Sequence, residues 1–452
     1  MSKICVLLLV PVFLLSGLLP ALAIQSSDFD DPSVCKGCHA EIYEQWNGTL
    51  HSIAYTDPIY LGEEAMASED TDGLTDAYCS RCHTPIGVLS GEVPPIGLDN
   101  PALSEISKKG ISCDFCHSVN ASTGIGNGAF MVSVDGDKRG PFDDSKSPYH
   151  GSVYSELHTK SEFCGMCHDV LHPVNGIAIE ETYTEWKEGP YNTGDPETTT
   201  YCQDCHMTPG ITHFEKNPGK ASSIGPDREH IYTHYFVGGS TVIGSNQDMA
   251  EARLKAAAKL ELELTENGDE VNALVTVTNI GAGHKIPTGL TEAREVWLEI
   301  IATDSEGKKI FHAGGLDEDD IIVEDDTTVF RVVLGDSDGE PTMKVWKAEA
   351  TLSDNRIPPK GTSSEEYIFM LPDGATHPIT VKAKLNYRSA SPELLDPLFG
   401  KGVIVAPVIE MAVVTGMVGE SEAEETATPG FGIVSILISL IVGLHLLRIR
   451  RV

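Results

Sequence analysis

Five copies of one short pattern, C-x-x-C-H, constrain this chain more than any other feature of its sequence. C-x-x-C-H is the attachment signature of c-type haem, in which both cysteines form thioethers with the porphyrin and the histidine binds the iron. With 11 Cys and 16 His in 452 residues, chance would produce roughly 0.01 copies. The pattern therefore predicts five covalent haems, held by Cys35 and Cys38, Cys79 and Cys82, Cys113 and Cys116, Cys164 and Cys167, and Cys202 and Cys205, with His39, His83, His117, His168 and His206 as proximal iron ligands.

Zinc is the main alternative, because paired C-x-x-C motifs also build zinc ribbons and knuckles. Zinc ribbons do not require a histidine directly after every second cysteine, so haem is favoured. The cysteine balance agrees, since ten of the 11 cysteines lie in the motifs. The remaining one, Cys5, lies in an N-terminal segment that is expected to be removed.

The N-terminal segment has the pattern of a secretory signal peptide. Residues 1–23 contain Lys3, then an apolar run, then Ala21-Leu22-Ala23, which corresponds to a charged region, an apolar region and a cleavage site. The alternative is a retained N-terminal anchor, although the apolar run is near the lower limit for spanning a bilayer. Export suits the attachment of haem to cysteine, which in c-type cytochromes takes place outside the cytoplasm.

The C-terminal segment predicts a membrane anchor. An acidic linker, residues 417–428, leads to Pro429-Gly430-Phe431 and an apolar run that ends at three arginines, Arg448, Arg450 and Arg451. Such a run is near the minimum length for a transmembrane helix, and the arginines place its end in the cytoplasm. The segment 429–452 also resembles the archaeal PGF sorting tail, which implies removal of the helix and replacement by a lipid. In either case we expect the protein at the cell surface, on the extracellular side of the cytoplasmic membrane, anchored by its C-terminus.

The formal net charge of −35 excludes nucleic acid as a partner, because nucleic-acid binding requires a basic surface. The expected partners are redox proteins or extracellular electron acceptors, and the membrane through the C-terminal tail. A homopolymer is a further alternative.

The chain divides into two parts with different sequence patterns. Residues 24–249, rich in Gly, Pro and His, provide about 45 residues per motif, which is too little chain for an ordinary apolar core around each haem. The porphyrins are therefore expected to form the core of a mainly α-helical and irregular pentahaem domain. Residues 250–416 are predicted to form a β-sandwich, so the predicted fold class is α+β multidomain with a C-terminal transmembrane helix.

Alternating apolar residues without intervening helices predict the strands of the sandwich. They follow a short helix that Asn246 and Asp248 could cap and that extends through Ala258. The expected strands are Val271 to Thr278, Val296 to Ala302, Thr328 to Leu334, Val345 to Thr351, Glu366 to Met370 and Ile379 to Leu385.

Two acidic loops are weak candidates for calcium, which takes oxygen ligands. Acidic loops exposed to solvent explain them at least as well. The residues are Asp135, Asp137, Asp143 and Asp144, and separately Asp317, Asp319 and Asp320.

Histidines outside the motifs are the candidates for the sixth iron ligand, which decides whether a haem transfers electrons or reacts. Enough of them lie among or soon after the motifs to make every haem bis-histidine. Their sequence contexts suggest helices for His51, for the pair His150 and His158, and for the pair His230 and His234, and a loop for His284. The distal candidates are His51, His150, His158, His172, His234 and His284.

Several segments resemble known cytochromes. Cys35 to Ala54, with Tyr43, Trp46 and His51 in place, resembles the opening of the tetrahaem cytochrome c family of ammonia oxidisers. A wider group of exported multihaem cytochromes, in which a haem-rich half precedes a β-sandwich, is similar at Phe163 to Gly176, Tyr201 to Met207, His230 to Gly239 and Gly283 to Gly289. The resemblance implies electron transfer through stacked haems, with His51, His234 and His284 as distal ligands. Five motifs instead of four mean that the ligand pairing cannot be copied from the family.

Three functions are compatible with these patterns. The favoured one is a cell-surface relay that passes electrons through five mostly bis-histidine haems, rather than an enzyme. A multihaem reductase of nitrogen or sulfur oxyanions would need one iron with a free coordination position. The third is a subunit of a conductive cytochrome filament, with the sandwich as the contact between copies.

Overall fold

The computed structural model describes residues 23–290 and 292–419. The predicted signal peptide, the C-terminal tail 429–452 and most of the linker 417–428 lie outside these residues. Within the described ranges, no helix combines the length and the apolar character needed to cross a bilayer.

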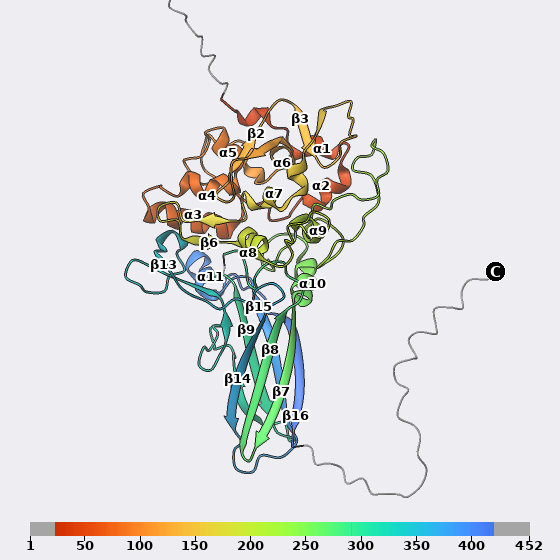
Figure 1. Cartoon of the computed structure of the whole chain (residues 1–452). Helices are drawn as coiled ribbons and strands as arrows, with labels where there is room; N and C mark the ends of the chain where they lie inside the picture. The colour runs from red at the N-terminus through yellow and green to blue at the C-terminus, as the bar shows by residue number, and fades with distance from the viewer. Residues whose placement is uncertain (1–22, 291, 420–452) are drawn as a thin grey trace, which may run out of the picture.

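The described chain is elongated and has two visibly different ends (Figure 1). One end contains short helices and the other contains long strands that extend away from them. Helix α10 (Gln247–Ala257) lies at the junction and continues directly into the first long strand, β7 (Ala258–Asn267). The five motifs are therefore all in the helical half, and the strand β16 (Ile409–Val418) ends at the tip farthest from them.

The helical half has little regular structure between its short helices. Its helices are α1 (Pro32–Lys36), α2 (Ala40–Trp46), α3 (Pro58–Asp70), α4 (Asp76–His83), α5 (Pro85–Leu89), α6 (Cys113–Ser118), α7 (Ser161–Gly165), α8 (Thr182–Glu188) and α9 (Cys202–His206). Three two-stranded sheets join them, made by β1 (Val119–Ser122) with β2 (Phe130–Val132), β3 (Asp137–Gly140) with β4 (Gly151–Tyr154), and β5 (Val170–Leu171) with β6 (Ala178–Glu180).

The apolar core of this half is small and divided. One cluster contains Phe29, Ile86, Phe115, Phe130 and Met166, and a second is built around Tyr55, Val93 and Leu103. Clusters of this size are modest for a segment of more than 200 residues, which normally shares one contiguous core. This division is in keeping with the expectation that porphyrins supply much of the packing.

The other half is a sandwich of two antiparallel sheets. One sheet has the order β10 (Lys309–Ala313), β9 (Glu295–Thr303), β15 (Ile379–Arg388), β16, and the short β11 (Val329–Phe330) also pairs with β9. The other has the order β14 (Thr362–Met370), β8 (Glu270–Asn279), β7, and a separate ribbon pairs β12 (Val332–Gly335) with β13 (Ala350–Asp354). Alternate residues point inward, so that Val271, Ala273, Val275 and Val277 of β8 are fully buried.

Most of the predicted strands match this sandwich, with three differences. The expected strand from Thr328 breaks into β11 and β12, and the one from Val345 begins with a 3₁₀ turn, so that β13 starts only at Ala350. Strands β7, β10 and β16 were not predicted. Asn246 does lie at the N-cap of α10, but its φ of 66° is left-handed and its side chain makes no capping hydrogen bond.

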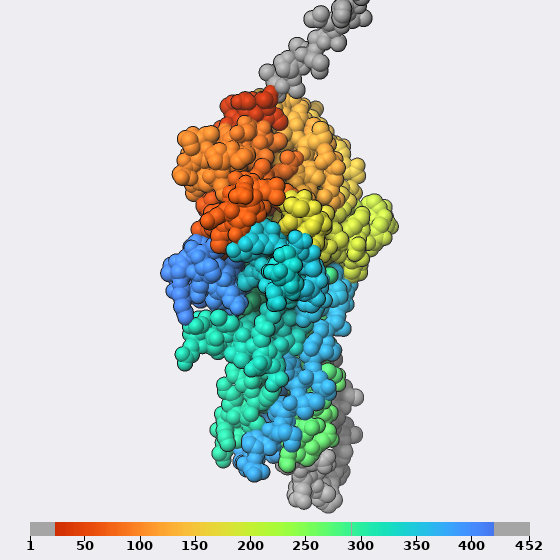
Figure 2. Space-filling view, turned by 90° about the vertical axis from the view of Figure 1, so that its left-hand side faces the viewer, coloured from red at the N-terminus to blue at the C-terminus, as the bar shows by residue number. Residues whose placement is uncertain are grey.

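The two halves meet over a broad front. Figure 2 shows the cyan segment that contains β12 and β13 meeting the orange helices of the N-terminal half, with α11 (Pro392–Phe399, blue) beside it. Polar contacts stabilise this interface between the two halves. The Asp70 carboxylate of α3 accepts hydrogen bonds from Lys344 Nζ (3.0 Å) and Trp346 Nε1 (2.9 Å).

Candidate haem-binding sites

Each of the five motifs begins in, or forms, a short helix. Helices α4, α6 and α9 contain complete motifs, whereas α1 and α7 begin motifs whose histidines, His39 and His168, come just after the helix. The Ser112 hydroxyl caps α6 by accepting a hydrogen bond from Phe115 N–H. One helical turn brings the two cysteines and the histidine of each motif close together.

The five motif histidines share one arrangement: each ring uses Nδ1 for a bond to an oxygen acceptor. The acceptors are Ala221 O for His39 (2.6 Å), Ala54 O for His83 (3.0 Å), Arg139 O for His117 (2.5 Å), Glu180 Oε1 for His168 (3.3 Å) and Val237 O for His206 (2.9 Å). An acceptor at Nδ1 fixes the hydrogen there and leaves the Nε2 lone pair for a metal. This is the ligand form of histidine, repeated five times.

The motif side chains also fit a haem better than a zinc ion. All ten motif cysteines are partly accessible, and the His168 side chain keeps 51% of its surface accessible, so that a cofactor can reach them. Among the described residues, no three His, Cys, Asp or Glu side chains come together as a metal-binding group. A tetrahedral zinc site needs four such ligands, so this donor arrangement argues against the zinc alternative.

Contacts between motifs define their order in space. Thiols lie close enough to shift each other's pKa between Cys35 and Cys113, between Cys82 and Cys167, and between Cys164 and Cys202. The loop after the third motif bonds to the fourth, because Gly126 N–H and Gly128 N–H donate to the carbonyls of Gly165 and Met166 (both 2.8 Å). These contacts place the third motif next to the first and the fourth, and the fourth next to the second and the fifth. The second motif also bonds to the loop after the third, where Arg81 Nε donates to Gly128 O (2.7 Å).

Three candidate distal histidines have ring centres at ligand spacing from a motif histidine, and two of them, His51 and His234, make no hydrogen bond through Nε2 within the described residues. Two imidazoles bound to one iron by bonds of about 2 Å have ring centres about 6 Å apart. The ring centres of His51 and His168 are 6.1 Å apart, and those of His234 and His117 are 6.4 Å apart. His51 thus faces the fourth motif and His234 the third, and each serves a motif distant in sequence.

His51 lies in a turn, not on the expected helix, because α2 ends at Trp46. Ile111 N–H donates to His51 O (2.8 Å), and Gly110 packs so closely on this carbonyl that a Cβ would lie 2.5 Å from it. Burial, together with the neighbouring imidazoles, lowers the pKa of His51 to about 3. The ring is therefore neutral at physiological pH, as a ligand must be.

His230 and His234 do not share a helix face, because the segment that contains them is irregular. The His234 main-chain N–H donates to Gln45 Oε1 (2.9 Å), and its Nδ1 contacts Tyr232 O (3.0 Å), which leaves Nε2 free. Burial lowers its pKa to about 3. His230 differs, because its Nδ1 accepts a hydrogen bond from Asn217 N–H (3.1 Å).

His284 lies in the expected loop of the sandwich and is close enough to His206 for the two imidazoles to interact electrostatically. Its Nδ1 contacts Lys285 O (2.9 Å), so Nε2 remains available. Burial, with contributions from Arg253 and His284, lowers the pKa of His206 to about 3. The sandwich thus supplies a candidate distal ligand to the fifth motif.

The three remaining candidates are less favourably placed. The ring of His158 is 5.8 Å from that of His117, but its Nε2 contacts Cys116 O (3.0 Å). His172 uses both nitrogens, since Nε2 contacts Trp346 O (3.1 Å) and Nδ1 accepts from Val174 N–H (3.4 Å). His150 contacts the carbonyl of Gly151 through Nδ1 and so keeps Nε2 available, but among the described residues its ring lies at ligand spacing from no motif histidine. His150 and His158 lie in a bend and a 3₁₀ turn instead of one helix.

No second imidazole lies at ligand spacing from His39, His83 or His206 among the described residues. Instead, the ring of Tyr60 stacks on His83 with centres 3.8 Å apart and planes 7° apart. The Tyr60 hydroxyl donates to Glu64 Oε1 (2.5 Å), and burial raises the pKa of Tyr60 well above its ordinary value. Tyr60 is thus a neutral aromatic neighbour of the second motif.

Two further residues of these sites lie outside every motif, and nothing in the sequence pattern singled them out. Phe236 lies against both His51 and His234, with ring centres 4.7 and 5.4 Å away, and its φ of 47° is left-handed. Such a φ is unusual for a bulky residue and occurs mostly at functional positions. The second is Glu180, the only carboxylate among the five Nδ1 partners.

Glu180 shifts the titration of His168. Burial lowers the pKa of His168, but the hydrogen bond and the charge of Glu180 outweigh burial and raise it. Burial raises the pKa of Glu180, but His168 and the nearby Arg294 outweigh burial and lower it. The Glu180 side chain is therefore an ionised carboxylate.

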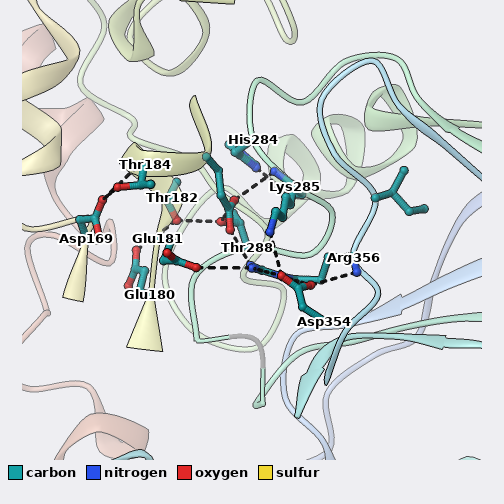
Figure 3. A network of polar contacts seen from close by, with 12 residues as sticks. Asp169, Glu180, Glu181, Thr182, Thr184, His284, Lys285, Thr288, Asp354 and Arg356 are labelled. Atoms are coloured by element: carbon teal, nitrogen blue, oxygen red, sulfur yellow. Dashed lines mark hydrogen bonds and ion pairs between the residues drawn. The ribbon is translucent and has the colours of Figure 1, made fainter. Parts of the chain in front are cut away.

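A network of polar contacts joins this carboxylate to the sandwich (Figure 3). Thr182 Oγ1 contacts Glu180 Oε1 (3.2 Å) and Thr288 Oγ1 (2.8 Å). Glu185 accepts hydrogen bonds from Lys285 N–H (3.0 Å) and Thr288 Oγ1 (2.7 Å). The loop that contains His284 is thus fixed to α8 by the side chain of Glu185.

The calcium expectation has no support in the described residues. The Asp317 carboxylate accepts hydrogen bonds from the N–H groups of Asp319 (2.8 Å) and Ile321 (2.9 Å), so it stabilises its own turn. Others pair with cations: Asp135 with Arg139, Asp144 with Arg228, and Asp319 with Lys401. The acidic loops are therefore turns with ion pairs.

Comparison with known proteins agrees with this geometry. Residues 34–118, which include the first three motifs, match the family described as cytochrome c554 and c-prime. The fold resembles a penta-heme cytochrome c552 from Thermochromatium tepidum, with a TM-score of 0.61, 20% identity and coverage of 86% of this chain and 99% of that chain. These two matches support a multihaem cytochrome c.

Other matches are weaker. An alkylpurine DNA glycosylase from Pseudomonas fluorescens has a TM-score of 0.14 and 10% identity, with coverage of 36% of this chain and 32% of that chain, and carries no argument. No curated protein sequence matches the chain.

Proposed function

We propose that this multihaem cytochrome c is an exported electron relay that carries five covalent haems, most of them bis-histidine. The observation that carries the proposal is the repeated arrangement of five motif histidines, each tied through Nδ1 with Nε2 left for iron. An iron between two imidazoles changes oxidation state with little rearrangement, which favours electron transfer.

The contacts between motifs support a continuous path. Three of the neighbouring pairs of motifs approach each other through their cysteines, which are the points at which haem edges are attached, and the third and fourth motifs meet through the loop after the third. An electron that enters at the first motif would pass to the third and then the fourth, from which both the second and the fifth are adjacent. The fourth motif is the junction of this path.

Location at the cell surface is the part of the proposal that rests on the termini alone. The supporting features are the signal pattern of residues 1–23 and the PGF-type tail 429–452. Deletion of 429–452 should release a soluble protein with its haems into the medium. Retention of the shortened protein in the membrane fraction would contradict anchoring by the tail.

A reductase of nitrogen or sulfur oxyanions is the second candidate, and one observation favours it. His83 has Tyr60 beside it instead of a second imidazole. A haem with one protein ligand would have a free position for substrate. The net charge of −35 opposes this candidate, because it repels anions.

One experiment on the oxidised, haem-loaded protein separates the two candidates. Electron paramagnetic resonance distinguishes six-coordinate low-spin haems from high-spin haems with a free position. Intact mass gives the haem count, expected to be five. The relay predicts mostly low-spin signals and no turnover of nitrite, hydroxylamine or sulfite above the rate of free haem. Saturable turnover that disappears when His83 is replaced would establish the reductase instead.

A further inference from the structure

The fourth motif differs from the other four in the partner of its histidine. His168 Nδ1 lies 3.3 Å from the carboxylate oxygen Oε1 of Glu180, whereas the other four motif histidines bond to main-chain carbonyls. A carbonyl is a neutral acceptor and a carboxylate carries a charge. The difference therefore acts on the electron density of one imidazole out of five.

The backbone holds Glu180 in this position. Strand β6 ends at Glu180 and pairs with β5. In this pairing Glu180 lies opposite Val170, which comes two residues after His168. The Glu180 side chain is 15% exposed and the His168 side chain 51% exposed, so water reaches the contact from the side of the ring only. The position is thus fixed by the chain fold and does not depend on a mobile surface side chain.

Two threonines lie between the carboxylate and the sandwich. Thr182 and Thr288 have one hydroxyl hydrogen each, but together they make three contacts, to Glu180, to Glu185 and to each other. The two shortest contacts, Thr288 to Glu185 (2.7 Å) and Thr182 to Thr288 (2.8 Å), use both hydrogens. The hydrogen bond that Glu180 accepts is therefore mainly the one from His168.

We propose that Glu180 is a positioning residue that makes the haem of the fourth motif the lowest in reduction potential of the five. A carboxylate that accepts the Nδ1 hydrogen raises the basicity of the imidazole, which stabilises ferric iron more than ferrous iron. The proposal rests on haem attachment at the fourth motif, as in the proposed function. It adds that the haem at the junction of the path is the hardest of the five to reduce. Electrons therefore cross this haem and do not remain on it.

The test is a spectroelectrochemical titration of the haem-loaded protein and three variants. Glu180→Gln keeps the size of the side chain and removes its charge, whereas Glu180→Asp keeps the charge and shortens the side chain. Glu162→Gln is the matched control, because Glu162 lies on α7 beside the same motif but bonds to Tyr183, not to a haem-ligating ring. Intact mass confirms the haem content of each variant.

We expect Glu180→Gln to move one of the five components, the lowest, to higher potential and to alter one low-spin paramagnetic signal. Glu180→Asp should shift the potential of this component less, and Glu162→Gln should leave that potential unchanged. A larger shift in Glu180→Asp than in Glu180→Gln would assign Glu180 a steric role and overturn the proposal. Equal shifts in Glu180→Gln and Glu162→Gln, or no shift in Glu180→Gln, would overturn it as well.

The outcome is separable from that of the relay proposal. If the protein proves to be a reductase, the lowest component still moves in Glu180→Gln. If no reduction potential changes in Glu180→Gln, the proposal for Glu180 is wrong, but the relay can still operate with another order of potentials.

Discussion

At the residue scale, His234 and His230 form a natural comparison, because they lie four residues apart in one irregular segment. His234 leaves Nε2 free at ligand spacing from His117, whereas His230 accepts a main-chain hydrogen bond at Nδ1. His234→Ala should free one iron position and produce a high-spin signal and carbon-monoxide binding. His230→Ala is the control and should leave the absorption and paramagnetic spectra unchanged. Identical spectra in both variants would remove His234 from the ligand set.

Glu292 makes a second prediction at this scale, which concerns pH. Burial raises the pKa of Glu292 to about 8 from 4.5, and its Oε2 has no hydrogen-bond partner. The folded protein then holds a proton that the unfolded chain releases above about pH 4.5. The free energy of unfolding should therefore fall, by up to about 1.4 kcal/mol per pH unit, as pH rises towards 8.

Glu292→Gln should flatten this dependence between pH 5 and 8, as measured by denaturant unfolding followed by circular dichroism. Glu229→Gln, at a side chain that is 91% exposed, is the control and should keep the slope of the unaltered protein. A slope that survives in Glu292→Gln would mean that another group binds the proton.

At the element scale, the sequence predicted the sandwich better than the helical half. Strands such as β8 and β15 alternate apolar and polar residues with a period of two, which is a local signal. Strand β7 alternates as well, but its Leu, Glu and Lys residues also favour helices, and it follows α10 directly. The helices expected around His51 and His234 do not form, because the main chain of these residues is held by tertiary hydrogen bonds, from Ile111 N–H to His51 O and from His234 N–H to Gln45.

The motif residues could be predicted because the haem signature is local, whereas the residues around them could not. Glu180 and Phe236 are ordinary residues in the sequence, and only the fold brings them to His168 and His51. The pairing of His51 with the fourth motif could not be predicted from the sequence either, because His51 and His168 are 117 positions apart in the chain.

The junction between the sandwich and α8 makes a prediction about stability. Arg356 and Glu185 form an ion pair (2.5 Å) with side chains that are 3% and 2% exposed. Arg356→Met leaves the Glu185 charge buried without this partner, which should cost about 3–5 kcal/mol of unfolding free energy. Lys216→Met, in a pair with Glu229 that is largely exposed, should cost under about 1 kcal/mol.

Denaturant unfolding followed by circular dichroism measures both changes. The double variant Arg356→Met, Glu185→Gln should recover part of the loss, because no unpaired charge remains. A cost for Arg356→Met as small as that for Lys216→Met would show that the pair does not hold the two halves together.

At the scale of the whole molecule, the path through the fourth motif has a testable consequence. Replacing Cys164 and Cys167 by Ala removes the haem that adjoins three others, and it should abolish the fast redistribution of a photoinjected electron, followed by haem absorbance. Replacing Cys79 and Cys82 by Ala removes one covalent haem as well, but it leaves the contacts of the first, third, fourth and fifth motifs intact. This second variant should keep the fast phase, because no remaining haem loses its neighbour on the path. Equal loss in the two variants, each with four haems by mass, would mean that the second motif is part of the main path and that the order of the motifs differs from the one proposed.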